Sequence, residues 1–147
     1  MKGNKEIINK LNNLLADFQI YYQNLRGFHW NIQGKEFFEL HTKFEELYTD
    51  AALKIDEIAE RILTVGGIPL HSFEDYLANA QIKPVKNIHD GETSVKTIVT
   101  NIEHLLSQEK ELKALAGECA DSGTEDQMSA LIEIQEKTLW MYRAYLK

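Results

Sequence analysis

Residues 36–69 read EFFELHTKFEELYTDAALKIDEIAERILTVGGIP, and this stretch decides the fold. Its apolar residues recur at intervals of three and four, so they share one face of an α-helix. Gly66-Gly67 followed by Pro69 is a normal helix stop, because proline cannot continue a helix. We therefore predict a helix from about Glu36 to Val65. Its apolar face comprises Leu40, Phe44, Leu47, Ala51, Ile55, Ile58 and Ile62.

Three further segments show the same period, and together they predict four long helices. The first helix runs from about Asn4 to Ile32, and the third from about Glu92 to Cys119. Asp121-Ser-Gly123 should separate the third helix from the fourth. Thr124-Glu-Asp-Gln127 should then cap the fourth helix, which continues to the C-terminus.

The connection between the second and third helices, from Ile68 to His89, is long for an uninterrupted loop. Within it, Ser72-Phe-Glu-Asp75 has the form of a capping box, which predicts a short helix from Phe73 to Asn79. The sequence shows no strand-like alternation of useful length and no internal repeat. Two helical hairpins joined by one long crossover predict an all-α four-helix bundle, with a short extra helix between helices 2 and 3.

The composition fits one packed domain over residues 1–147, with 44 % apolar residues in a chain too short for two comfortable domains. A net charge of −7 attracts cations and disfavours broad phosphate binding. Cys119 is the only cysteine, so no internal disulfide can form. Because no signal-peptide pattern and no apolar run of membrane-spanning length occurs, we expect a soluble, cytoplasmic protein.

Two pairs of side chains in the second helix have the spacing and chemistry of metal ligands. His41 and Glu45 are four residues apart, and Asp56 and Glu60 repeat that interval, so each pair leaves one helix face. Imidazole together with carboxylate is a ligand mixture typical of iron sites that keep exchangeable positions. His29, at the end of the first helix, lies within reach of the His41 pair.

These two pairs cannot bind the same ion within one subunit. His41 and Asp56 are fifteen residues apart, which corresponds to a rise of roughly 22 Å and a difference in azimuth of about 60°. An antiparallel copy of the helix, related by a two-fold axis, would place one pair beside the other pair of its partner. The spacing therefore predicts an intersubunit metal site, made twice per dimer. The alternative, a site inside one bundle built on Glu-x-x-His, lacks that motif in this sequence.

Many of these positions resemble the signature of the Dps family of mini-ferritins, a branch of the ferritin-like superfamily. The matching residues are His29, Trp30, Gly34, Phe37, His41, Asp56, Ala59, Glu60, Arg61, Gly66, Gly67 and Pro69, with Leu139-Trp140-Met141 in the last helix. The resemblance covers nearly the whole chain and implies a ferritin-like bundle that assembles into a hollow homo-dodecamer. It also implies ferroxidase centres at the dimer two-folds, Fe(II) oxidation preferably by hydrogen peroxide, and storage of ferric oxide, which protects the cell from oxidative stress.

The resemblance assigns roles residue by residue. It implies five iron ligands. His29, His41 and Glu45 come from one subunit, and Asp56 and Glu60 come from its partner. Glu45 stands where the family pattern usually has Asp, so the charge is kept on a side chain one methylene longer. Trp30 matches a tryptophan beside the centre, whose indole can supply an electron when peroxide takes two.

Acidic residues also surround the turn before the last helix: Glu118, Asp121, Glu125 and Asp126. The resemblance implies that acidic residues in this region line pores through which Fe(II) enters, with Asp126 the first candidate, followed by Asp121 and Glu118. The alternative is a solvated turn, in which Glu125 and Asp126 favour the helix N-terminus electrostatically.

Two other functions fit parts of the sequence. The first is a nucleoid protein that binds DNA, with a secondary metal site. The net charge of −7 disfavours it, and Lys2, Lys5 and Lys10 at the front are interrupted by Glu6, so we expect weak or absent DNA binding. The second is a bundle that holds a metal without redox chemistry, such as zinc, on the same side chains. The remaining histidines, His71, His89 and His104, are expected at the surface or in loops.

Overall fold

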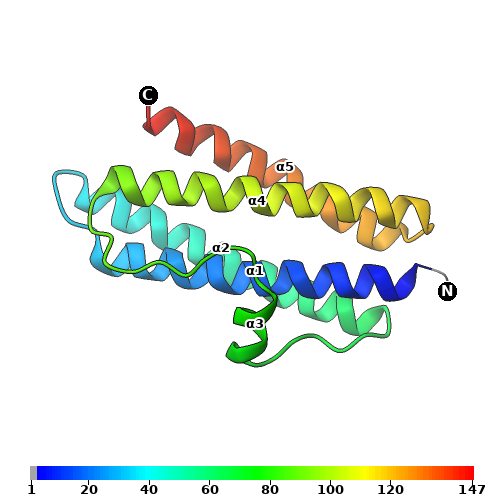
Figure 1. Ribbon diagram of the computed structural model, residues 1–147. Coiled ribbons are helices and arrows are strands. Elements are labelled where there is room, and N and C mark those ends of the chain that lie inside the picture. Colours follow the sequence, from blue (N-terminus) through cyan, green and yellow to red (C-terminus); the bar gives the residue numbers. More distant parts are fainter. Residues whose placement is uncertain (1–2) are drawn as a thin grey trace.

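Five helices and no strand make up the part of the chain that the computed structural model describes, residues 3–147 (Figure 1). Lys2, which belongs to the basic N-terminal group, lies outside this range. The helices are α1 (Asn4–Asn31), α2 (Phe37–Thr64), α3 (Phe73–Asn79), α4 (Gly91–Glu118) and α5 (Ser122–Tyr145). The predicted all-α bundle is confirmed, and the short helix α3 has the predicted bounds.

The four long helices lie alongside one another, and the crossover carries α3 against the outside of α1 (Figure 1). α1 packs on α2 and α4 packs on α5, each pair running in opposite directions, and α1 also packs on α4. The crossover returns the chain from the far end of α2 to the opposite end of the bundle, where α4 begins (Figure 1). No helix within residues 3–147 is long and apolar enough to cross a membrane.

α2 and α4 end in the same pattern of backbone hydrogen bonds. In each, the two residues after the cap donate their N–H groups back to the last turn, at 2.8–3.2 Å. This is the Schellman motif, which places the first residue beyond the cap in the left-handed region. Gly66 occupies that position after α2 with φ +94°, and Ala120 occupies it after α4 with φ +56°. Because an alanine side chain disfavours this conformation, the α4–α5 turn is the more strained of the two.

α5 begins earlier than the sequence predicts, and Thr124 lies inside its first turn. The N-cap is Asp121, whose carboxyl oxygens accept hydrogen bonds from the Thr124 backbone N–H at 3.1 Å and the Thr124 hydroxyl at 2.7 Å. Arg61 of α2 donates to Asp121 at 2.7 Å and to the Thr124 hydroxyl oxygen at 3.0 Å. Asp and Thr are both good caps, and this contact from α2 holds Asp121 in the capping position.

Two polar side chains of α1 attach the crossover to the bundle. Asp17 is completely buried, and its Oδ1 accepts from the backbone N–H groups of Gln81 and Ile82, both at 2.7 Å. Asn24, two helical turns later on the same face, accepts from the Val85 N–H at 3.1 Å. These bonds satisfy loop N–H groups that have no partner in a helix or sheet, which stabilises an irregular segment against the bundle.

The core extends along the whole bundle. Its largest fully buried side chains include Leu11, Leu14, Leu15, Phe18, Leu25, Phe44, Ile58, Ile62, Ile98, Ile102 and Leu105. A second fully buried acid besides Asp17, Glu109 of α4, lies among them. Gln135 of α5 donates to its Oε1, whereas its Oε2 has no partner among the described residues. Burial raises the pKa of Glu109 to about 8, and the hydrogen bond from Gln135 opposes this only in part.

We expect Glu109→Gln to stabilise the protein by about 2–3 kcal/mol at pH 7, because the native chain must take up a proton to bury this carboxyl. A raised carboxyl pKa means that native stability is lost as pH rises from the ordinary value of 4.5 towards about 8. The difference in free energy of unfolding between the variant and the native protein should therefore grow between pH 4.5 and about pH 8 and stay constant above that range. Urea unfolding at several pH values, at one protein concentration, measures this.

The matched control is Glu118→Gln, which alters an exposed carboxyl on the same helix. It should change stability by less than about 0.5 kcal/mol. An advantage of Glu109→Gln that is the same at low and high pH would contradict the assignment.

Candidate metal centre

His29 near the end of α1 and His41 in α2 stack ring on ring, with centroids 3.7 Å apart and planes at 13°. His29 Nδ1 lies 2.6 Å from the carbonyl oxygen of His41, and His41 Nδ1 lies 2.7 Å from the carbonyl oxygen of His29. Each ring is thus bonded to the backbone of the other residue. This reciprocal pair ties the end of α1 to the start of α2 and fixes the orientation of both rings.

The hydrogen bonds also determine which ring nitrogen carries the proton. A carbonyl oxygen can only accept, so Nδ1 must be the donor in each ring. In a neutral imidazole, Nε2 then keeps its lone pair. Histidines that bind metals usually donate the other ring N–H to a carbonyl or carboxylate, which orients the ring. His29 and His41 therefore present two oriented Nε2 donors.

Glu45, one turn after His41 on α2, completes this half of the constellation. Its Oε1 lies 3.6 Å from His29 Nε2. This separation is too long for a hydrogen bond, but it is close to the about 3–3.5 Å between two donors that share one first-row metal ion. The His29 side chain is 8 % exposed and the Glu45 side chain 57 % exposed, so the half-site opens to the surface on the carboxylate side.

Asp56 and Glu60 lie on the same unbroken helix, both exposed. The structure brings together His29, His41 and Glu45, and it places Asp56 and Glu60 farther along α2, roughly 22 Å away by helical rise. Within residues 3–147, no group of three or more His, Cys, Asp or Glu side chains is arranged to hold a metal ion. The five predicted ligands thus lie in two separate groups on one chain, and a metal site shared between two chains stays a prediction.

Tyr48 is a neighbour of the half-site that sequence reasoning did not select. Its ring packs edge-on against His29, with centroids 5.3 Å apart. Tyr48 follows His41 by seven residues, two helical turns, and that spacing is the signal that places it on the same face. Trp30 instead is 57 % exposed and lies under the Arg26 guanidinium, 4.8 Å from its ring centroid.

The three pore candidates have different surroundings. Glu118 and Asp126 are exposed. Asp121 is engaged as the cap of α5 and pairs with Arg61. Its partial burial acts to raise the pKa of the carboxyl, but the hydrogen bonds from Thr124 and Arg61 outweigh burial and hold that pKa below its ordinary value. A pore role for these residues stays a prediction.

His104 of α4, expected at the surface, is joined to the interior. Its Nε2 lies 3.2 Å from Asp17 Oδ2, and its side chain is 28 % exposed. The two residues are 87 positions apart, so no local pattern in the sequence pairs them.

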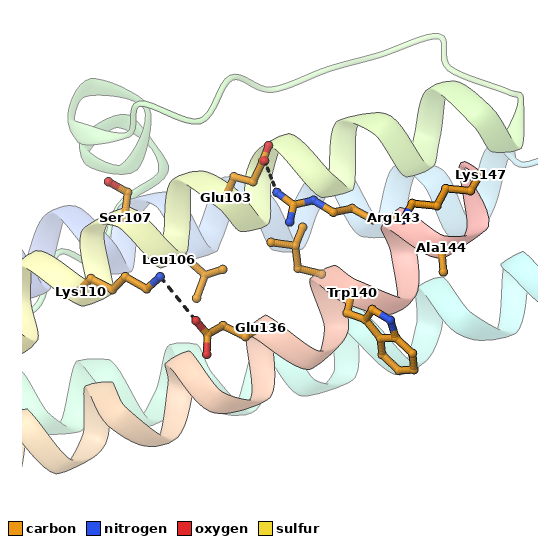
Figure 2. A pocket seen from close by; sticks show the side chains of 10 residues that line it. Glu103, Leu106, Ser107, Lys110, Glu136, Trp140, Arg143, Ala144 and Lys147 are labelled. Carbon is orange, nitrogen blue, oxygen red and sulfur yellow. Dashed lines mark hydrogen bonds and ion pairs between the residues drawn. The ribbon is translucent and has the colours of Figure 1, made fainter.

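A groove of about 740 Å³ runs between α4 and α5 (Figure 2). Two ion pairs bridge it, Glu103 with Arg143 at 2.5 Å and Lys110 with Glu136 at 3.5 Å (Figure 2). All four side chains are half exposed, and such surface pairs contribute little to stability. Trp140 lies at the edge of this groove and is 66 % exposed (Figure 2).

Comparisons with known proteins agree with this fold along its length. A family model described as a ferritin-like domain matches residues 8–147. The DNA protection during starvation protein of Porphyromonas gingivalis is 43 % identical over 139 residues, which is 95 % of this chain and 87 % of that protein. DNA protection during starvation protein 2 of Bacillus anthracis is 39 % identical over 143 residues, 97 % of this chain and 98 % of its own length.

The solved structure of a DPS protein from Vibrio cholerae O1 shares 54 % identity with this chain. The two superpose with a TM-score of 0.98, over 99 % of this chain and 91 % of that one. That protein is described as a member of a broad superfamily of ferritin-like diiron-carboxylate proteins. The fold and these comparisons thus define a ferritin-like four-helix bundle protein. Within that class, the chain belongs to the Dps family.

We expect Asp121→Asn to lower the free energy of unfolding by about 1–2 kcal/mol at pH 7, because the cap and its pairing with Arg61 are weakened. A carboxyl group whose pKa is lower in the folded than in the unfolded protein stabilises the fold at pH values above its ordinary pKa. This contribution is lost as the pH falls through the lowered pKa. The gap between variant and native protein should therefore narrow below about pH 4. Urea unfolding at pH 7 and in this acidic range measures it.

Asp126→Asn is the control, since Asp126 is an exposed acid in the same helix. It should have little effect on unfolding at either pH. If Asp121→Asn lowered the free energy of unfolding equally at both pH values, the pairing of Asp121 with Arg61 would not be the cause.

Proposed function

We propose that this chain is a ferroxidase and iron-storage subunit whose di-iron centres form between two copies of the chain. The observation that carries the proposal is the reciprocal His29–His41 pair, which orients two Nε2 donors beside Glu45. The donor set of imidazole and carboxylate suits iron with exchangeable positions. Membership in a family that includes a ferritin-like diiron-carboxylate protein supports iron as the ion.

The second half of each centre would come from Asp56 and Glu60 of a second copy. Around α2, Glu45, Asp56 and Glu60 fall within about 60° of one another, so all three would face one partner. The exposed Leu53 and Leu63, 60 % and 58 % accessible in one chain, share that stripe. Apolar side chains beside the carboxylates indicate a surface that another protein surface covers.

The middle of this stripe carries small side chains. Residue 43 lies midway between His41 and Glu45, and residue 58 lies midway between Asp56 and Glu60. If two antiparallel copies of α2 place residue 43 opposite residue 58, the two-fold axis passes between residues 50 and 51. Thr49 and Ala52, both exposed, lie there on the same side of the helix. Their size permits the close approach that brings His41 of one chain to Asp56 of the other.

The residues of the site have distinct tasks in the proposed reaction. His29 and His41 offer neutral donors already oriented by the backbone, so little ordering is needed when Fe(II) binds. The three carboxylates compensate the positive charge, and this effect strengthens as Fe(II) becomes Fe(III). Two Fe(II), one hydrogen peroxide and two protons then give two Fe(III) and two waters. Trp30 is the proposed additional electron donor when only one iron is present.

Family membership also supports a proposal for the wider assembly. We infer a hollow shell of twelve subunits that keeps the ferric product inside, with acidic residues such as Asp126 at the entry. The names of the two curated relatives describe DNA protection, which makes DNA binding the second candidate function. The net charge of −7 per chain works against it, because phosphate neutralisation by Lys and Arg supplies most non-specific affinity for DNA.

Complementation between two inactive chains tests the shared site. One chain carries His29→Ala and His41→Ala, and the other carries Asp56→Ala and Glu60→Ala. Neither alone should oxidise Fe(II) when a single addition of peroxide follows anaerobic loading, as read from ultraviolet ferric absorbance. Assemblies formed from equal amounts of both should regain about a quarter of the native sites, because half of the dimers are mixed and each holds one intact centre.

The same chains mixed after assembly, without exchange of subunits, are the control and should stay inactive. If the co-assembled sample also remained inactive, with its mixed composition verified by native mass spectrometry, the centre would not be shared between two chains.

Ala52→Arg tests the proposed axis directly. A long charged side chain at the closest approach should separate the two copies of α2, so the dimer contact and Fe(II) oxidation should be lost together. Light scattering and the ferric absorbance assay measure the two effects. Ala114→Arg, the same change at an exposed alanine of α4, is the matched control and should keep oxidation. An Ala52→Arg protein with native oxidation would exclude this axis.

A further inference from the structure

Two tyrosine rings continue outward from the His29 half-site, each packed on the ring before it. The Tyr48 ring lies edge-on against the His29 ring, with centroids 5.3 Å apart and planes at 76°. The Tyr22 ring lies edge-on against the Tyr48 ring in turn, with centroids 5.9 Å apart and planes at 81°. Aromatic pairs prefer this arrangement. Tyr48 belongs to α2 and Tyr22 to α1, so the packing of the two helices creates an unbroken series of three rings.

The phenol groups of this series are suited to one-electron chemistry. A phenol that loses an electron also loses its hydroxyl proton, so the radical that remains is neutral. Tyr48 and Tyr22 are both partly exposed in one chain, so solvent can take up that proton. A phenylalanine ring would fill the same space and make the same edge-on contacts, but a strong oxidant cannot draw an electron from it at a comparable potential.

Trp30, the other oxidisable ring close to His29 in the chain, has a cation over its face. The Arg26 guanidinium lies 4.8 Å from the centroid of the indole ring, where the π electrons attract it. An indole that loses an electron becomes a cation before it loses its proton, and this cation would be repelled by Arg26. Arg26 also lies over the Tyr22 ring at 5.3 Å, but a neutral phenoxyl radical is repelled far less. The structure therefore favours a phenol as the first donor.

We propose that Tyr48 donates one electron to the iron centre when only one Fe(II) is present, and that Tyr22 then reduces the oxidised Tyr48. This inference rests on the proposed ferroxidase function, because it needs Fe(II) and peroxide beside His29. Tyr48 touches a ring that is a proposed iron ligand, so the electron has a short path to the metal. Trp30 keeps its proposed part as a donor, but Tyr48 precedes it.

The electron from Tyr48 decides what becomes of the peroxide. Without it, one Fe(II), one hydrogen peroxide and one proton give one Fe(III), one hydroxyl radical and one water. With it, one Fe(II), one phenol, one hydrogen peroxide and one proton give one Fe(III), one phenoxyl radical and two waters. The O–O bond breaks in both reactions, but only the second avoids a free hydroxyl radical. Tyr22 then passes a hydrogen atom, as an electron and a proton, to the Tyr48 radical, and the radical moves to α1.

Rapid freezing followed by electron paramagnetic resonance of the assembled protein tests the donor. The protein is loaded anaerobically with one Fe(II) per proposed centre and then given one peroxide per iron. The native protein should show a tyrosyl radical, which ring-deuterated tyrosine identifies through a changed hyperfine pattern. Tyr48→Phe keeps a ring against His29, so loss of the early tyrosyl signal in this variant would report the missing phenol. Hydroxyl radical captured by a spin trap should increase in the same variant.

Two further variants separate the steps and provide the control. Tyr22→Phe should keep the early signal of Tyr48 but prevent the later change in hyperfine pattern, because the radical can no longer move to α1. Tyr76→Phe is the matched control, since Tyr76 is a partly buried tyrosine of α3 outside the series of rings. Its radical spectrum and its yield of trapped hydroxyl radical should equal those of the native protein.

The ferric absorbance of the native protein with two Fe(II) per centre is measured beside these spectra. A normal ferric signal with no tyrosyl radical at low iron loading would overturn the inference and leave the proposed ferroxidase function standing. A tyrosyl or tryptophanyl radical that Tyr48→Phe leaves unchanged would also overturn it. Absence of the ferric signal itself would contradict the proposed function and this inference with it.

Discussion

The rise of an α-helix sets the distance between residues on one element, and the organisation of this protein depends on that constraint. α2 is a single helix of 28 residues, and it carries His41 and Glu45 towards one end and Asp56 and Glu60 towards the other. Roughly 22 Å of rigid helix separates them. No rearrangement of side chains can close that gap. The proposed metal site therefore depends on a second copy of the chain, which links the proposed activity to assembly.

The half-site at His29 and His41 is prepared before any ion binds. The two backbone carbonyl oxygens fix the tautomer and the ring planes, and the same bonds join α1 to α2. The structural role of this pair and its proposed role as a metal-binding pair thus rest on the same hydrogen bonds. Glu45, Asp56 and Glu60 are exposed in one chain, and the exposed Leu53 and Leu63 lie on the same helix. The proposed dimer would cover all five side chains.

Polar groups inside the bundle affect its stability in opposite directions. Asp17 and Asn24 satisfy the backbone of the crossover and so allow a long irregular segment to lie against α1. Glu109 has only one hydrogen-bonded oxygen and folds at the cost of taking up a proton. Asp17 also contacts His104 of α4 at 3.2 Å, so one buried acid joins α1 to the crossover and to α4.

The four long helices could be predicted from periodicity alone, because a 3.6-residue repeat is a local property. The short helix α3 could be predicted from another local signal, its N-cap Ser72. The spacing along residues 41–60 was also enough to predict two half-sites. The start of α5 was not predictable, since Asp121 is selected as its cap by Arg61 from another helix. The same holds for the stacking of His29 on His41, for Tyr48 beside them, and for Asp17 behind His104. These contacts join residues far apart along the chain or on different helices, and only the packing of those helices decides which side chains meet.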